Sequence, residues 1–149
     1  MFRHILCPTD LKERAYIALR SAVQIAHQFN ACITMLNVHS EFMDKDERKM
    51  LRVSVDEQKE KYKQIAIESK KEMKAAMEKL HVDDIEIHYL LHGGDPADTI
   101  VAAAAEQGAD LIVMCTDGRD SIKDFVSGTI TEHVINHAPC PVLVVPQPR

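Results

Sequence analysis

Tryptophan is absent from this sequence of 149 residues, and aromatic residues of all kinds make up only 5% of it. The core must therefore be built from aliphatic side chains and methionine. No apolar run approaches the roughly 20 residues that a membrane-spanning helix needs. The apolar start of the chain ends at Pro8 and Asp10, which is too early for a signal peptide. We therefore expect no membrane partner and a cytoplasmic location.

The sequence also lacks an excess of positive charge and any C-x-x-C pair. A net charge of −5 argues against nonspecific binding of nucleic acid, which requires a basic face. It does not exclude an anionic ligand, because backbone amides at helix N-termini bind phosphate without net positive charge. The four cysteines are predicted to be mostly buried thiols rather than a disulfide framework or a zinc site; they are Cys7, Cys32, Cys115 and Cys140.

Apolar runs alternate with segments of helical periodicity along the whole chain. The runs predict strands at residues 3–8, 32–38, 85–91, 111–115 and 142–145. The periodic segments predict helices at 12–29, 44–80, 95–107 and 128–137, the second with a break near 52–55. Asn30 and Gly108 are expected to end helices, and Asp95 with Pro96 to begin one. This order predicts an α/β fold, an open five-stranded, mostly parallel sheet with helices on both faces, in a single domain over residues 1–149.

Ligands of open α/β sheets bind beyond the carboxyl ends of the strands. Pro8, Thr9 and Asp10 follow the first strand, although Asp10 also has the simpler interpretation of a helix cap. The loop after the fourth strand ends at Gly128 and Thr129, at the predicted start of a helix. Glycine and free helix amides are typical of a phosphate site, but a capped helix gives the same pattern. The spacing alone leaves both readings open.

Three segments together resemble a known family. The first is Ile5-Leu6-Cys7-Pro8-Thr9-Asp10, and the second is Gly94-Asp95-Pro96 with the run 109–114. The third is Met114-Cys115-Thr116-Asp117-Gly118, nine residues, Gly128-Thr129 and the run 137–145. This combination is similar to the universal stress protein family, whose signature is G-x-x-G, nine residues, then G-[S/T]. The resemblance covers essentially the whole chain and implies a Rossmann-like fold of the adenine nucleotide alpha hydrolase type.

Carried over by position, the resemblance implies a site for ATP, ADP or AMP. Its adenosine end would be held by Pro8, Thr9, Asp10 and Val38. Its phosphate end would be held by the loop residues Met114, Cys115, Thr116, Gly118, Arg119, Gly128, Thr129 and Ile130. Cys115 departs from the family pattern, because it replaces the first glycine and places a side chain in the loop. Asp117 adds a negative charge that either repels phosphate or helps to bind Mg²⁺.

The resemblance therefore favours a regulator of stress response or signalling that binds an adenine nucleotide, at most a slow ATPase. The alternative is an interaction protein of the same fold that binds no nucleotide, with Cys115 marking a decayed site. An adenylyl-transferring enzyme is a third reading, but Pro8-Thr9-Asp10-Leu11 lacks the phosphate motif usual near the first strand of such enzymes. His133 and His137 have a metal-binding spacing without an evident third ligand, so no metal site is predicted. We also expect a homodimer formed through the C-terminal strand, residues 142–146, because an apolar edge strand favours pairing.

Overall fold

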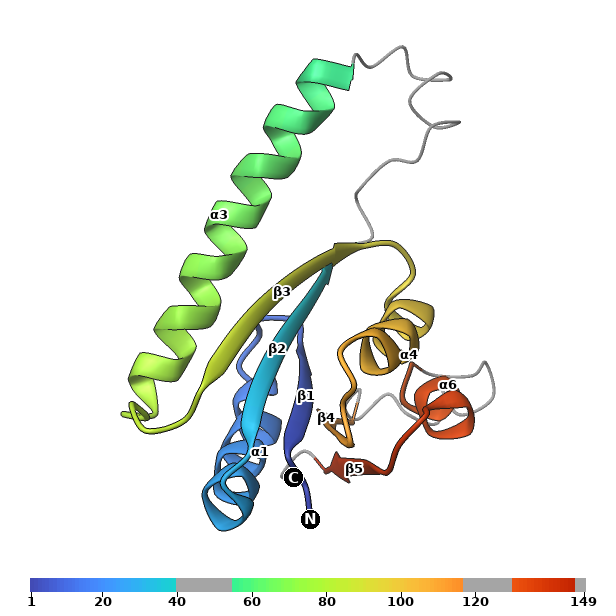
Figure 1. Cartoon of the computed structure of the whole chain (residues 1–149). Helices are drawn as coiled ribbons and strands as arrows, with labels where there is room; N and C mark the ends of the chain where they lie inside the picture. The colour runs from blue at the N-terminus through green and yellow to red at the C-terminus, as the bar shows by residue number, and fades with distance from the viewer. Residues whose placement is uncertain (40–54, 117–129, 147–149) are drawn as a thin grey trace.

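The computed structural model describes residues 1–39, 55–116 and 130–146, with the side chains of 55–58 excepted. Strands and helices alternate through these residues (Figure 1). The elements are β1 (His4–Thr9), α1 (Ala15–Phe29), β2 (Cys32–His39), α3 (Val55–Lys79), β3 (Ile87–Gly93), α4 (Pro96–Glu106), β4 (Leu111–Cys115), α6 (Ile130–His137) and β5 (Val142–Val145).

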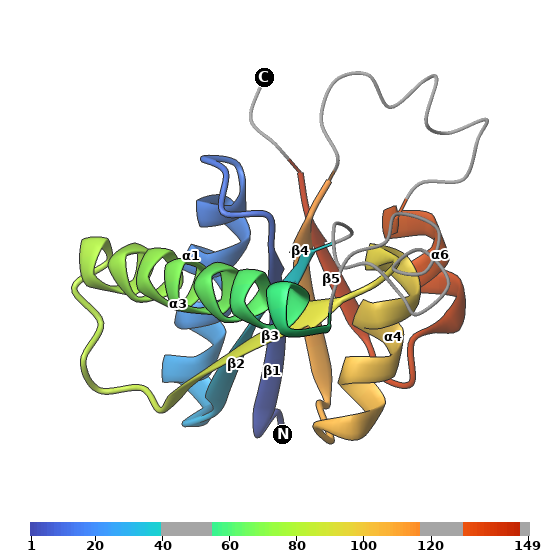
Figure 2. The ribbon, with the colours of Figure 1, turned by 90° about the horizontal axis from the view of Figure 1, so that it is seen from above.

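The five strands form one sheet in the order β3-β2-β1-β4-β5, and all neighbours are parallel. Helices α1 and α3 cover one face of the sheet, and α4 and α6 cover the other (Figure 2). The predicted α/β fold with an open parallel sheet is therefore confirmed. None of the described helices has the length and apolar character required to cross a lipid bilayer.

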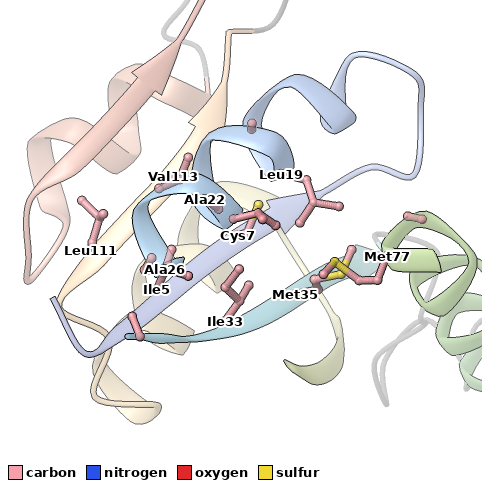
Figure 3. Packing of buried hydrophobic residues seen from close by; sticks show 14 of the residues in the cluster. Ile5, Cys7, Leu19, Ala22, Ala26, Ile33, Met35, Met77, Leu111 and Val113 are labelled. Atoms are coloured by element: carbon pink, nitrogen blue, oxygen red, sulfur yellow. The ribbon is translucent and has the colours of Figure 1, made fainter. Parts of the chain in front are cut away.

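The central strands are apolar throughout because helices pack on both of their faces. In β1, Ile5 and Cys7 point into the cluster beneath α1 and α3, whereas Leu6 joins the cluster beneath α4 and α6. Figure 3 shows the first cluster, in which Cys7 lies among aliphatic side chains and methionine. Burial, with a smaller contribution from the charge of Cys115, raises the pKa of the Cys7 thiol to about 12. Cys7 is thus a buried apolar residue, as predicted, whereas the other three cysteines are only partly buried.

Several predicted boundaries are wrong by one to three residues. The third strand begins at Ile87 rather than at 85 and extends to Gly93, because its register with β2 runs from Ile33–Ile87 to His39–Gly93. The first strand likewise spans His4–Thr9 rather than 3–8, in register with β2. The predicted break near 52–55 and the start of the predicted helix 44–80 fall largely outside the described residues.

The first helix begins at Ala15 rather than at residue 12. Residues 12–14 form a turn instead, because the amides of residues 15–17 donate to carbonyls three positions earlier, and Leu11 before this turn has a φ of 64°. The Asp10 side chain accepts a hydrogen bond from the Lys12 amide at 2.9 Å, whereas the N-cap of α1 is Arg14, which makes no side-chain cap bond. Asp10 therefore stabilises the turn before the helix and is not its N-cap.

Other predicted helix ends are confirmed by their geometry. Asn30 ends α1 in the left-handed conformation, with a φ of 55°. The Asp95 side chain accepts a hydrogen bond from the Asp98 amide at 3.0 Å, and Pro96 occupies the first turn of α4. These caps fix where α4 begins, and α4 forms one wall of the cleft described next.

Candidate functional site

A cleft of about 170 Å³ opens at the carboxyl ends of the central strands. The chain leaves β1 toward β2 on one side, and β4 joins β1 on the other side, so strand order reverses at this point. Such a switch point leaves a crevice between the outgoing loops, which is the usual ligand site of open α/β sheets. The cleft receives residues from β1, β2, β4, α1, α4 and α6.

The structure brings all of the predicted site residues that it describes to this one cleft. Eight of them line it: Pro8, Thr9, Asp10, Val38, Met114, Cys115, Thr116 and Ile130. The other four, Gly118, Arg119, Gly128 and Thr129, lie outside the described residues. Segments far apart in the sequence therefore meet at one cleft, with residues that the resemblance assigned to both ends of a nucleotide. Their part in binding a nucleotide stays a prediction.

The turn between β1 and α1 is held by its own side chains. Thr9 Oγ1 accepts a hydrogen bond from the Leu11 amide at 3.0 Å, and Asp10 Oδ1 accepts one from the Lys12 amide at 2.9 Å. These bonds keep Leu11 in the left-handed region, where a residue with a Cβ is strained by about 1–2 kcal/mol. Strain of this kind concentrates at functional sites, because the surrounding structure must hold it in place.

Arg14 brings a positive charge into the cleft, and the sequence analysis did not single it out. Its Nη2 and Nε donate to Asp10 Oδ2 at 2.9 and 3.1 Å. The side chains of Arg14 and Asp10 are 31% and 37% exposed, so the pair stays accessible to a ligand. Both residues precede the first residue of α1, Ala15, so their pairing follows from the conformation of the turn and helical periodicity did not predict it.

The opposite wall of the cleft is apolar. Four further lining residues were missed by the sequence analysis: Ala15, Leu36, Pro96 and Ile100. Pro96 and Ile100 stand four positions apart on α4, so they present one face of that helix to the cleft. The spacing is readable from the sequence, but which face of α4 meets the cleft is not.

Cys115 lines the cleft and also packs against the core cluster on the α1 side of the sheet. Its neighbour Met114 joins the cluster on the α4 and α6 side, since successive residues of a strand point to opposite faces. The substitution of the family's glycine therefore adds a side chain that is partly taken up by core packing, and Met114 contributes to the apolar wall.

Thr131 lies in the first turn of α6, next to the lining residue Ile130. Its Oγ1 is buried and is the one such side-chain polar atom, among the described residues, without a hydrogen-bond partner. A buried hydroxyl without a partner costs about 1–3 kcal/mol.

The described part of the chain contains no group of three His, Cys, Asp or Glu side chains that could hold a metal ion. The rings of His133 and His137 stack at 4.3 Å, and His133 Nε2 lies 3.0 Å from Asp98 Oδ1. These contacts link α6 to α4. The two helices that they join both contribute residues to the cleft.

Comparison with known proteins gives consistent results. The family model described as "Universal stress protein family" matches residues 1–146. Universal stress protein MJ0531 of Methanocaldococcus jannaschii is 29% identical over 150 residues, covering 100% of this chain and 85% of the relative. The solved structure of MJ0577, from the same organism, has a TM-score of 0.76 and 28% identity, covering 100% of this chain and 99% of that one. The universal stress protein UspA of Lactobacillus plantarum has a TM-score of 0.73 and 26% identity, with 97% of each chain covered.

More distant structures with the same fold contain nucleotides. One is a universal stress protein in complex with cAMP, with a TM-score of 0.67 and 22% identity, covering 99% of this chain and 98% of that one. Another is a universal stress protein from Archaeoglobus fulgidus in complex with dAMP, with a TM-score of 0.60 and 21% identity, covering 97% of each chain. At these identities the comparison establishes the shared fold.

Proposed function

Because this chain belongs to the universal stress protein family, we propose that it binds an adenine nucleotide in the cleft at the ends of β1 and β4. One observation carries the proposal. Residues from three distant segments, which the family resemblance alone had assigned to one site, line a single cleft. The nucleotide is ATP, with ADP and AMP as alternatives, and the protein acts as a cytoplasmic regulator of stress response or signalling. The bound cAMP and dAMP of the distant family structures support the choice of an adenine nucleotide.

The two walls of the cleft suit the two ends of such a ligand. The apolar wall, with Leu36, Val38 and Ile100, fits the flat adenine base, which loses its contact with water when the nucleotide binds. On the polar side, Asp10 is an acceptor for ribose hydroxyls, and Arg14 balances part of the phosphate charge. The amides at the start of α6, where Ile130 lines the cleft, extend this side toward phosphate oxygens. Asp117, predicted either to repel phosphate or to help bind Mg²⁺, lies outside the described residues.

A regulatory role agrees better than catalysis with the residues that the structure describes. Asp10 is the only carboxylate among the described lining residues of the cleft. Its oxygens already accept hydrogen bonds from the Lys12 amide and from Arg14. A carboxylate held in this way is a poor base for an attacking water, so we expect hydrolysis to be slow or absent.

We expect protein purified under native conditions to release adenine nucleotide when it is denatured, as identified by chromatography. The stripped protein should then bind Mg-ATP saturably in a calorimetric titration. An empty protein that gives no response to Mg-ATP would overturn the proposal. That result would favour an interaction protein in which Cys115 and Asp117 have closed the site.

We also propose that the protein forms a homodimer through residues 142–146. In the described sheet, β5 is an edge strand that pairs only with β4, and its Leu143 is 38% exposed. An exposed apolar edge invites pairing with another strand. Sedimentation at micromolar concentration should show a dimer, and Leu143→Lys should shift it toward monomer. A monomeric wild-type protein would contradict this expectation.

A further inference from the structure

The cleft attracts anions from two directions. Arg14, in the turn directly before α1, is the only positively charged side chain among its described lining residues. The start of α6, where Ile130 lines the cleft, offers backbone amides and the positive end of a helix dipole. Helices α1 and α6 cover opposite faces of the sheet (Figure 2). The two anion-attracting positions therefore flank the cleft and do not coincide.

The guanidinium of Arg14 is held in place before any ligand arrives. Its Nε and Nη2 donate to Asp10 Oδ2, and Asp10 Oδ1 accepts from the Lys12 amide, so the pair is anchored to the backbone of the turn. A guanidinium carries more N–H donors than one carboxylate oxygen accepts, and they form a rigid planar fork. Such a group loses little conformational freedom when it binds an anion, which favours binding.

The place of Arg14 indicates which part of a nucleotide it meets. Under the proposed function, on which this inference rests, Asp10 accepts a hydrogen bond from a ribose hydroxyl. Arg14 contacts the same carboxylate at 2.9 Å, so its guanidinium lies beside the edge of the ribose that carries the 2′ and 3′ oxygens. In dinucleotide-binding α/β folds, an arginine near the ribose accommodates a phosphate on the 2′ oxygen. The 5′ carbon leaves the ring from its other side, in keeping with a 5′ phosphate at the start of α6.

We propose that the cleft prefers an adenine nucleotide with a second phosphate on the ribose itself, at the 2′ or the 3′ oxygen. The ribose phosphate accepts charge-assisted hydrogen bonds from Arg14, and the remaining ribose hydroxyl donates to Asp10. A nucleotide that carries phosphates only on its 5′ oxygen occupies the α6 position and reaches Arg14 only by folding its chain back. Asp10 offsets the charge of Arg14, so the preference depends on directed N–H bonds and we expect it to be moderate.

The test compares nucleotides that have the same number of phosphates in different places. The full chain, stripped of nucleotide, is titrated by calorimetry with adenosine 3′,5′-bisphosphate, with adenosine 2′,5′-bisphosphate and with ADP. Mg²⁺ is left out, because ADP chelates it more strongly. We expect one of the two bisphosphates to bind about tenfold more tightly than ADP. The tighter isomer identifies the ribose oxygen that faces Arg14.

Substitution of Arg14 separates recognition of the ribose phosphate from support of the turn. Arg14→Gln should weaken binding of the preferred bisphosphate about tenfold and binding of AMP about threefold or less. Arg14→Lys keeps the charge without the fork, so its loss should be intermediate. If Arg14 only held the turn, the two affinities would fall by the same factor. Arg20→Gln is the matched control, because Arg20 is exposed on α1 outside the cleft, and its affinity ratio should equal that of the wild type.

Two results would overturn the inference while leaving the nucleotide site in place. One is a wild-type protein that binds ADP at least as tightly as both bisphosphates. The other is an Arg14→Gln variant in which the affinities for AMP and for the bisphosphate fall equally. Failure of every adenine nucleotide to bind would instead overturn the proposed function, and this inference with it. A thermal melt of each variant shows that the fold is retained.

Discussion

Asp10→Ala is expected to lower the affinity for Mg-ATP about tenfold or more. The carboxylate is the acceptor for ribose in the proposed complex, and it also holds Arg14 at 2.9 Å in the cleft. Removing it deletes the acceptor and releases the cation together, so both ends of the nucleotide lose a contact. Calorimetric titration of the stripped variant measures the change.

Asp83→Ala is the control for this variant. Asp83 is exposed on the segment between α3 and β3 and is not among the lining residues of the cleft. The same change in net charge there should leave ATP affinity within about twofold, since a distant surface charge is screened. Equal ATP affinity in Asp10→Ala and wild type would remove Asp10 from the site. A thermal melt of each variant separates loss of binding from loss of fold.

Ile112→Ala should lower the free energy of unfolding by about 2–5 kcal/mol. Ile112 is fully buried in β4 and packs in the cluster beneath α4 and α6. The substitution removes three carbons from a position that the sheet and two helices enclose, so the cavity that remains closes only partly. Urea denaturation followed by circular dichroism gives the difference.

Ile67→Ala makes the same chemical change on α3, where Ile67 is 53% exposed. It creates no enclosed cavity, and alanine has the higher helix propensity, so its effect should stay within about 0.5 kcal/mol. If Ile67→Ala lowered the free energy of unfolding as much as Ile112→Ala does, the cluster beneath α4 and α6 would not dominate stability.

The fold was largely predictable because its signals are local and repeated. The run Ile5-Leu6-Cys7 is apolar at consecutive positions, which is typical of a strand covered on both faces. Asp95 followed by Pro96 gave the start of α4 correctly. The start of α1 was missed, because the helical pattern extends back to residue 12 while residues 12–14 form a turn that the Asp10 side chain helps to hold.

The candidate site was predictable where residues follow strands and less so where helices supply a wall. Pro8, Asp10 and Thr116 lie at strand ends, whose meeting point follows from the parallel topology. Ile100 lines the cleft only because α4 packs across the sheet at a particular angle, which periodicity does not specify. The contact between Asn37 and Ser69 was not predictable for a similar reason, since it requires the rotation of α3 that places Ser69 against β2.

The position of β1 in the sheet has a consequence for how the chain folds during synthesis. β1 emerges first and pairs with β2 soon afterwards, but its other neighbour is β4, which begins only at Leu111. At synthesis rates of about 5–20 residues per second, one edge of the apolar central strand stays open for several seconds. Pairing between segments so distant in sequence is slow, because loop closure precedes any favourable contact. The nascent chain is therefore most prone to aggregation before β4 emerges, and a product truncated ahead of Leu111 keeps that open edge permanently.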